Sequence, residues 1–168
     1  MNLYLLRHGI AVERGTLGFE IDRLRPLTDD GRAKMEQIAT AMRGLGLKFD
    51  VILTSPFVRA LQTAEIAAAA LGQMKRLLQE PNLQADRSPQ EFLAQLAVKF
   101  ADQENVLAVG HEPFLSAFAS TLLGLPGGSA LVMKKGGLCK LSVTQFKPKP
   151  IGQLEWLLTP KQLRAIAV

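Results

Sequence analysis

Short apolar runs alternate with longer helix-forming segments along most of the chain, and this alternation constrains the fold more than any other feature of the sequence. The runs 3–6, 51–53 and 106–109 are too short for helices and almost entirely apolar, which is typical of strands buried on both faces. A weaker candidate strand covers residues 74–79. Because strands that alternate with helices usually form a mostly parallel sheet covered on both sides, we expect a three-layer α/β/α fold.

Capping residues and glycines mark the ends of four helices between these strands. Thr28, Ser55 and Ser88 have the short polar side chains that cap helix N-termini, and a proline follows Ser55 and Ser88. Gly44 and Gly72 lie where the first two helical patterns end. We predict helices over about 28–45, 55–71, 88–101 and 113–124, glycine turns at 127–128 and 136–137, and a C-terminal antiparallel hairpin of strands 138–146 and 153–158.

The chain length suits one domain. Its 168 residues, 48% of them apolar, are enough for one hydrophobic core, and no linker divides them, so we expect a single domain over 1–168. No apolar stretch approaches the roughly 18 residues of a bilayer crossing, and the N-terminus lacks the pattern of a secretory leader. The single cysteine, Cys139, suits a reducing compartment. These features predict a cytoplasmic protein with no membrane partner; the role of Cys139 and the oligomeric state stay open.

The net charge of +5 suggests an anionic partner but does not identify it. A nucleic-acid partner is not expected, because one Trp and one Tyr cannot supply the aromatic stacking of single-strand binding proteins. The partners that remain consistent with this charge are an acidic protein and a phosphorylated substrate. Lys134, Lys135, Lys147 and Lys149 could steer such a partner, although we interpret them first as solvated surface lysines.

Both histidines of the chain follow a predicted buried strand and adjoin a glycine. His8 comes after the strand 3–6, and His111 comes after the strand 106–109. Ligands of open α/β sheets bind at the carboxyl ends of the strands, so both imidazoles are expected at the same edge. Taken singly, either residue could be a hydrogen-bonded core histidine, but their shared placement favours a functional site.

Two arginines lie in positions that suit an anion. Arg7 ends a strand with two buried faces, where a guanidinium needs a cleft or an anionic partner. Arg59 falls in the first turn of a predicted helix, where the helix dipole disfavours a cation by up to about 1 kcal/mol unless an anion binds there. Arginine forks at a helix N-terminus indicate a dianionic ligand such as a phosphoryl group, although a solvated Arg59 is the alternative.

Other chemistries lack the residues that they require. Two histidines without HxxxH or CxxC spacing do not make a zinc site, and no GxGxxG, GxxxxGK[ST] or GxSxG motif is present. We therefore predict no metal and no cofactor. Histidine as a nucleophile, with arginines holding a phosphoryl group, is the chemistry that remains.

Three ordered segments together resemble the signatures of the histidine phosphatase superfamily. They are 3–9 (LYLLRHG), 54–64 (TSPFVRALQTA) and 109–113 (VGHEP). The short chain, Ala11 after the Arg-His-Gly motif and the block 26–28 (PLT) resemble its small phosphohistidine phosphatase branch, called SixA. The likeness covers about residues 3–158 and implies the phosphoglycerate mutase-like α/β fold.

This resemblance implies a mechanism and a set of site residues. His8 would be the nucleophile that forms a phosphohistidine enzyme, and Arg7, Arg59 and His111 would hold the phosphoryl oxygens together with His8. Larger relatives supply a leaving-group acid from an inserted lid after the third strand, a region that is short here. Four carboxylates are candidates for this acid, and none is assigned: Glu80, Glu20, Asp22 and Glu112.

The short lid region favours a phosphohistidine carried by a signalling or phosphocarrier protein. An imidazole leaving group, with a pKa of about 6.5, needs less protonation than an alcohol. A site without a cover also suits a phosphoryl group displayed on another protein. The alternatives are a phosphatase or mutase for small phosphate esters, and a phosphate-binding module without turnover. The sequence does not name the physiological substrate.

Overall fold

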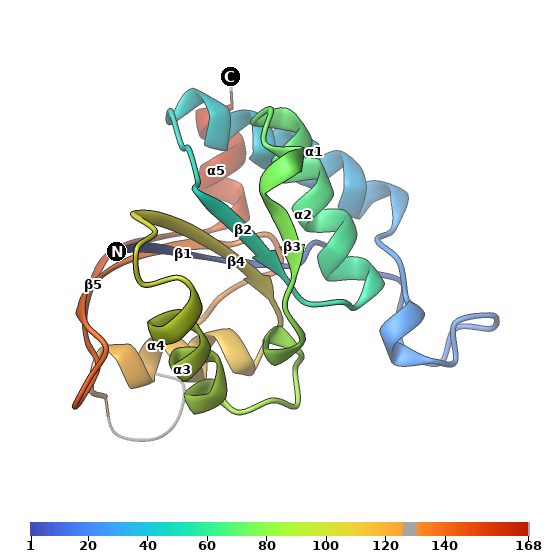
Figure 1. The fold of residues 1–168 in the computed structure, drawn as a ribbon. Helices are drawn as coiled ribbons and strands as arrows, with labels where there is room; N and C mark the ends of the chain where they lie inside the picture. The colour runs from blue at the N-terminus through green and yellow to red at the C-terminus, as the bar shows by residue number, and fades with distance from the viewer. Residues whose placement is uncertain (126–130, 168) are drawn as a thin grey trace.

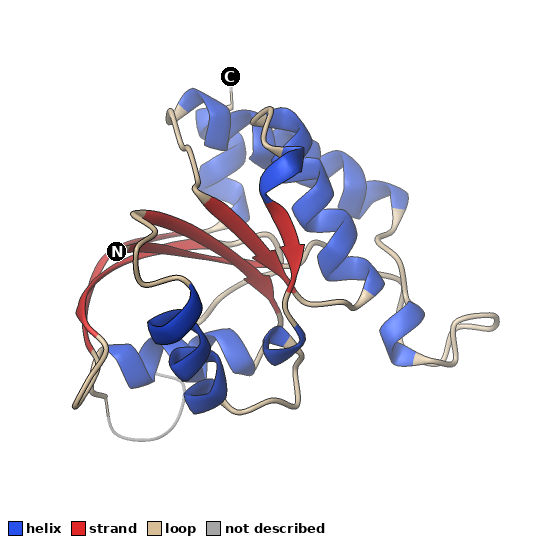
Figure 2. Cartoon of the chain, in the orientation of Figure 1, coloured by secondary structure: helices blue, strands red, loops and turns tan. Residues whose placement is uncertain are grey.

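A single six-stranded sheet forms the centre of the molecule (Figures 1 and 2). The computed structural model describes residues 1–125 and 131–167. The predicted turn at 127–128 lies outside these residues. The strands follow the order β3-β2-β4-β1-β5-β6 across the sheet. Their bounds are β1 Asn2–Arg7, β2 Val51–Thr54, β3 Leu77–Gln79, β4 Asn105–Gly110, β5 Leu138–Gln145 and β6 Ile151–Leu158.

The first four strands run parallel, and the last two are antiparallel. β1 pairs with β4 in parallel, in a register that places Arg7 opposite Gly110. β2 pairs in parallel with β3 and β4, whereas β5 pairs antiparallel with β1 and with β6. The predicted mostly parallel sheet with a C-terminal hairpin is therefore confirmed. Because the four strands run parallel, β1, β2, β3 and β4 all end at the same edge of the sheet.

Helices cover both faces of the sheet, as Figure 1 shows. α1 (Asp29–Gly44), α2 (Val58–Ala70) and α5 (Pro160–Ile166) pack on one face, and α3 (Pro89–Lys99) and α4 (Phe114–Leu122) pack on the other. Alternate residues of β1 enter the two layers: Leu3 and Leu5 contact the α3 and α4 side, and Tyr4 and Leu6 contact the α1 and α2 side. The predicted three-layer α/β/α architecture is confirmed.

The side-chain caps agree with the sequence at two of three predicted helix starts. Thr28 and Ser88 accept hydrogen bonds from the backbone N–H groups of Gly31 and Gln90, at 2.9 and 3.2 Å. The prediction of Ser55 as a cap was wrong, because α2 begins at Val58 and Phe57 occupies the N-cap position. Ser55 lies before the bend at residues 56 and 57, and its hydroxyl hydrogen-bonds to His111, which follows β4.

Two further elements differ from the prediction. Residues Met74–Arg76 form a 3-10 turn (η2), so β3 begins only at Leu77 and not at residue 74. α5 was not predicted, although its capping box, Thr159 with Gln162, and the proline at its first position are visible in the sequence. Two more 3-10 turns are η1 (Asp22–Leu24) and η3 (Pro81–Leu83). Among the described residues, no helix is both long and apolar enough to span a bilayer.

Candidate active site

The two histidines lie side by side where β1 and β4 end. His8 follows the last residue of β1, and its backbone N–H donates to the Gly110 carbonyl at 3.0 Å. His111 follows Gly110 directly. The centroids of the two imidazole rings are 5.0 Å apart. The parallel register of β1 and β4 thus brings together two residues that are far apart in the sequence.

Arg7, His8, Arg59 and His111 all line one cavity of about 300 Å³. The structure therefore brings together all four of the candidate site residues. Arg14, Arg25, Glu112 and Lys135 contribute to the wall of the same cavity. Of its eleven lining residues, five are lysine or arginine and two are glutamate, so the cavity is suited to an anion.

Hydrogen bonds fix the tautomer of His8. Its Nδ1 lies 2.7 Å from the Gly9 carbonyl oxygen, which can only accept, so Nδ1 carries the proton and donates. The lone pair of the neutral ring is then on Nε2, which accepts a hydrogen bond from Arg59 Nε at 3.3 Å. Gly9 is held in turn, because its N–H donates to Thr63 Oγ1 at 3.0 Å. The unprotonated nitrogen of His8 thus lies beside the guanidinium of Arg59.

Burial keeps both imidazoles neutral. It lowers the pKa of His8 from 6.5 to about 2, and the neighbouring His111, Arg59 and Arg7 act in the same direction. Burial also lowers the pKa of His111 from 6.5 to about 3, assisted by the positive charge of Arg59. Both side chains are almost completely enclosed, with exposed fractions of 6% and 1%. The lone pair of His8 is therefore available at neutral pH.

Ser55 positions His111. Its Oγ lies 2.8 Å from His111 Nε2 and also accepts from the Phe57 N–H at 3.3 Å. The Phe57 ring covers the imidazole, with a centroid distance of 5.0 Å. The other ring nitrogen, Nδ1 of His111, is buried and has no hydrogen-bond partner within the described part of the chain. One nitrogen of His111 is thus committed to Ser55, while the other can hydrogen-bond to a ligand.

Asp22 holds Arg59 in place from the loop that precedes α1. The backbone carbonyl of Asp22 accepts from Arg59 Nη1 at 2.8 Å, and its carboxylate accepts from Nη2 at 3.0 Å. The same carboxylate receives two hydrogen bonds from Arg25 and one from Arg14. Partial burial alone would raise the pKa of Asp22, but the hydrogen bonds and charges of Arg25 and Arg59 lower it to about 2. Asp22 therefore stays ionised and orients arginines, a role unlike that of a proton donor.

Arg7 reaches the cavity from the end of β1. Its Nη1 donates to the Met133 carbonyl at 2.7 Å, while its buried Nε has no partner among residues 1–125 and 131–167. Burial lowers the pKa of Arg7, and the negative charge of Glu112 opposes this effect. A guanidinium remains charged over the physiological pH range even so. Arg7 thus offers the cavity an unused donor.

The remaining candidate acids occupy three different environments. Glu80 is buried away from the cavity, where its carboxylate accepts from Asn82 N–H and Gln95 Nε2, both at 3.0 Å. Glu20 is exposed and accepts from the Gly18 N–H at 2.9 Å. Glu112 alone among the four lines the cavity: one of its oxygens accepts from Ser116, and Oε1 has no partner in the described residues. Of the four carboxylates, only Glu112 therefore has a free oxygen in the cavity wall.

Several residues that build the site were not identified from the sequence. The sequence predicts Ser55 as a helix cap and Asp22 as a candidate acid or a solvated loop charge. Arg25 and Thr63 were not singled out, although both are buried polar residues, and Lys135 was interpreted as a surface lysine. The burial of Arg25 is not predictable from the sequence, because it depends on the carboxylate of Asp22 lying beside it.

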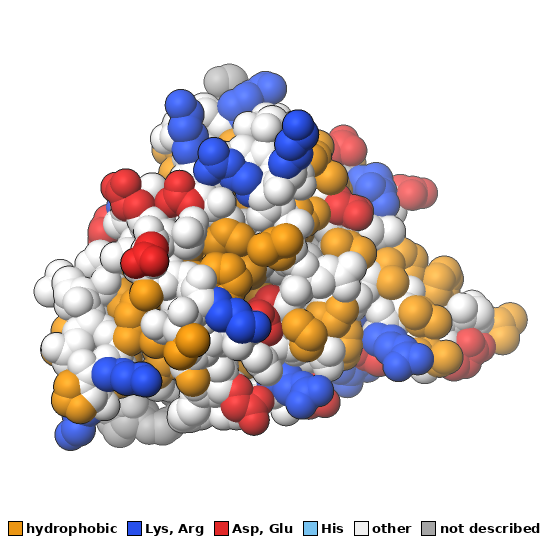
Figure 3. All heavy atoms as spheres, viewed as in Figure 1, with side chains coloured by type: hydrophobic (Ala, Val, Ile, Leu, Met, Phe, Trp, Pro, Cys, Tyr) orange, Lys and Arg blue, Asp and Glu red, His pale blue; other side chains and the backbone are white. Residues whose placement is uncertain are grey.

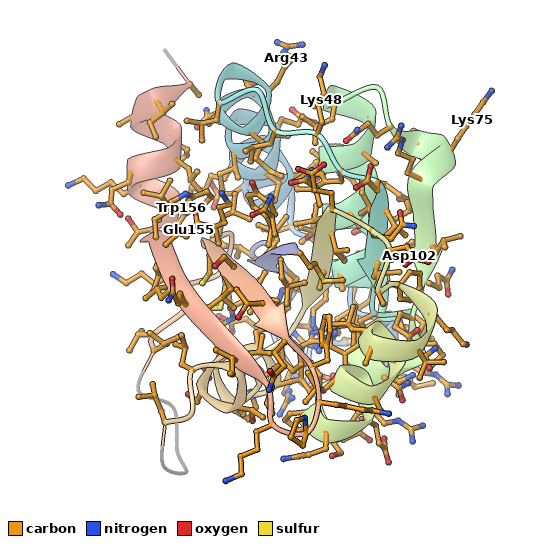
Figure 4. All side chains as sticks on the ribbon, turned by 60° about the vertical axis from the view of Figure 1, so that its left-hand side comes forward. Arg43, Lys48, Lys75, Asp102, Glu155 and Trp156 are labelled. Atoms are coloured by element: carbon orange, nitrogen blue, oxygen red, sulfur yellow. The ribbon has the colours of Figure 1, made fainter. Side chains whose placement is uncertain are left out.

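Other features do not offer a comparable site. A larger cavity, of about 660 Å³, lies between Tyr4, Lys48 and Trp156, and Figure 4 shows the last two on separate elements. It contains none of the four candidate residues. Among the described residues, no group of three or more His, Cys, Asp and Glu side chains could hold a metal ion. Cys139 is buried, and burial raises the pKa of its thiol to about 12, so it is not a nucleophile at neutral pH.

Residues 3–88 match the family described as histidine phosphatase superfamily (branch 1). An uncharacterised protein of Picosynechococcus is 37% identical over 97% of this chain and 99% of its own length. The phosphohistidine phosphatase SixA of Escherichia coli is 35% identical over 65 residues, which are 39% of this chain and 38% of SixA.

Solved structures are similar over almost the whole chain. A protein histidine phosphatase SixA complexed with tungstate matches with a TM-score of 0.84 and 24% identity, over 97% of this chain and 99% of the other. The alpha-ribazole phosphatase of Shigella flexneri matches with a TM-score of 0.74 and 20% identity, over 95% and 97% of the two chains. At these identities the similarity shows a shared fold.

Proposed function

Because this chain belongs to the histidine phosphatase superfamily, we propose that it removes the phosphoryl group from a phosphohistidine on another protein, through a covalent intermediate on His8. The membership supports a hydrolytic phosphatase. The observation that carries the finer proposal is the neutral His8, whose Nε2 lone pair lies in a cavity with Arg7, Arg59 and His111.

The first step is an in-line attack of His8 Nε2 on phosphorus. A bond forms between Nε2 and phosphorus, while the bond between phosphorus and the substrate imidazole breaks. The substrate ring is protonated on its other nitrogen, so it keeps the electron pair of the broken bond and leaves as a neutral imidazole. Neutral His8 needs no base to attack, because its proton is on Nδ1, where the Gly9 carbonyl holds it. Water then attacks the phosphohistidine enzyme, releases inorganic phosphate and restores neutral His8.

The cations of the cavity stabilise the transferring group. Negative charge accumulates on the equatorial oxygens of the phosphoryl group in the transition state. Arg7 Nε and His111 Nδ1 are two buried nitrogens that are free to interact with those oxygens, and Asp22 fixes the Arg59 fork beside them. Groups already held in place need little reorganisation during the reaction, which is the basis of electrostatic catalysis.

The surroundings of the cavity support an imidazole leaving group on a protein. Only a short 3-10 turn and a few loop residues separate β3 from α3, so the described chain has no inserted lid in this region. Glu80, the candidate acid that directly follows β3, is buried and engaged in other hydrogen bonds. A leaving group with a low pKa tolerates the lack of a dedicated acid better than an alcohol does.

A small phosphate ester is the second candidate substrate, and one observation favours it. Glu112 places a carboxylate with an unpartnered oxygen in the cavity wall, where it could protonate an alcohol. The alpha-ribazole phosphatase shares the fold, although its low identity to this chain carries no assignment of substrate.

The test compares hydrolysis of three substrates by the wild-type protein and by His8→Asn. The substrates are a protein phosphorylated on histidine, a phosphoserine peptide and a sugar phosphate. We expect the highest kcat/KM for the phosphohistidine protein and an acid-labile radioactive phosphoryl label on the wild-type chain only. Turnover or label that persists in His8→Asn would exclude the nucleophile. A higher kcat/KM for the sugar phosphate would support the small-ester function instead.

A further inference from the structure

A segment between β1 and α1 projects from the molecule beside the active-site cavity. We call residues 13–24 the arm; Figure 1 shows it extending away from the sheet and the helices. Large apolar side chains on the arm face solvent: Leu17 is 91% exposed, Ile21 52% and Leu24 50%. In Figure 3, hydrophobic side chains gather along this projection. An exposed apolar surface of this kind is typical of a contact site for another molecule.

Hydrogen bonds give the arm a defined shape. The Phe19 N–H donates to the Thr16 carbonyl at 2.9 Å, and an ion pair joins Arg14 to Asp22 across the arm at 2.9 Å. At its base, the Val12 N–H donates to the Pro26 carbonyl at 2.9 Å. A surface that is already shaped loses less conformational entropy when it binds than a flexible loop does.

The arm is continuous with the catalytic cavity. A groove of about 410 Å³, lined by Phe19 and Phe57, lies along the arm and shares Arg14, Arg25 and Ala85 with the catalytic cavity. Phe57 also contacts the ring of His111. A molecule whose phosphoryl group reaches the catalytic cavity can therefore extend along this groove towards the arm.

We propose that the arm is the docking surface for the phosphorylated protein substrate, and that Leu17 and Ile21 contact apolar residues around its phosphohistidine. The inference rests on the proposed function. The basic wall at the base of the arm complements the phosphoryl group of such a partner. A small ester contained in the catalytic cavity would not contact the exposed apolar side chains of the arm. A second copy of this chain seated on the arm would compete with substrate for the groove.

The test uses Leu17→Gln/Ile21→Gln, with Val98→Gln as a matched control. Val98 is 73% exposed, between Leu17 and Ile21, and lies at the end of α3, so the control changes an exposed apolar side chain away from the arm. Two substrates are compared: a histidine-phosphotransfer domain phosphorylated chemically on its histidine, and free phosphohistidine. We expect the double variant to lose about tenfold in kcat/KM for the protein, mainly through KM, which corresponds to about 1.4 kcal/mol shared between two apolar contacts. Activity on free phosphohistidine, which also reports correct folding, should be unchanged, and the control should match the wild type on both.

Each other outcome overturns the inference. Equal kcat/KM of the wild type for the two substrates, or an unchanged preference in the double variant, would refute the docking role alone. A wild-type dimer that the double variant converts to a monomer would show that the arm binds a second copy. Hydrolysis of neither phosphohistidine substrate, together with hydrolysis of sugar phosphates, would refute the proposed function and with it the docking of a phosphoprotein.

Discussion

Acidification should destabilise this protein through its two histidines. Both are buried and neutral in the folded chain, with pKa values lowered from 6.5 to about 2 for His8 and about 3 for His111. In the unfolded chain both regain a pKa near 6.5. Below this pH the unfolded state binds more protons than the folded state, so stability is complete above about pH 6.5 and falls as the pH decreases towards 3.

The size of the loss follows from the two pKa values. Between pH 7.5 and 5.0, each histidine that stays neutral when folded reduces the free energy of unfolding by about 2 kcal/mol, and the pair by about 4 kcal/mol. Natural domains are stable by about 5 to 15 kcal/mol, so this is a large fraction. Carboxylates contribute little to the change, because their ordinary pKa values of about 4 lie below this pH range.

Urea unfolding at the two pH values measures this loss directly. The variants are His8→Asn, His111→Asn and the double variant, each of which keeps a polar side chain of similar size. We expect each single variant to lose about half of the pH dependence, roughly 2 kcal/mol, and the double variant to lose most of it. Since the chain has only two histidines, NMR titration of the imidazole groups can be assigned from the single variants.

Two results would refute this reasoning. Imidazole resonances that titrate near pH 6.5 in the folded wild type would show that burial does not hold the rings neutral. A double variant that is as sensitive to acid as the wild type would show that other groups cause the loss.

Further substitutions test the positioning of the site and the packing of the fold. Asp22→Asn should lower kcat by about tenfold, because the guanidinium of Arg59 loses the carboxylate that holds it in the cavity. Asp30→Asn, which breaks only an exposed ion pair, should leave kcat unchanged. Glu112→Gln should change the rate of phosphohistidine hydrolysis by less than about twofold, but it should reduce the rate of any alkyl phosphate hydrolysis by more than about tenfold. Equal effects on both substrates would contradict the leaving-group argument. Gly31→Ala should lower the free energy of unfolding, measured in urea, by several kcal/mol, roughly the cost of severe overpacking, because the new Cβ would lie 2.0 Å from the backbone oxygen of Ile10. In the control Gly44→Ala, the new Cβ has no atom within 4 Å, and the free energy of unfolding should rise by about 0.5 to 1 kcal/mol.

The sequence predicts the position of the site because the relevant signals are local. A buried strand ends at Arg7, another ends before His111, and a helix starts just before Arg59. The rule that parallel strands end at one edge then brings these residues together without any knowledge of side-chain contacts. The α/β/α layers follow from the same local patterns.

The residues that orient the site are not predictable in this way. Ser55 contacts a residue 56 positions away, and Asp22 contacts one 37 positions away. Each has an ordinary local interpretation, as a helix cap for Ser55 and as a loop carboxylate for Asp22. Only the packing of α2 against η1 and β4 shows which interpretation applies. α5 is a different case, because Thr159, Pro160 and Gln162 form a helix start that is local and visible in the sequence.

The acid sensitivity of the fold and the proposed catalysis have the same physical cause. Burial of the His8 ring keeps its Nε2 unprotonated, as the proposed attack requires, and a partly buried site also strengthens the attraction between the two site arginines and a phosphoryl group. The same burial makes protonation of both histidines costly. A variant that opened the cavity to water should therefore be more stable in acid and a weaker phosphatase, which is the expected relation between stability and activity at a site built to be complementary to an anion.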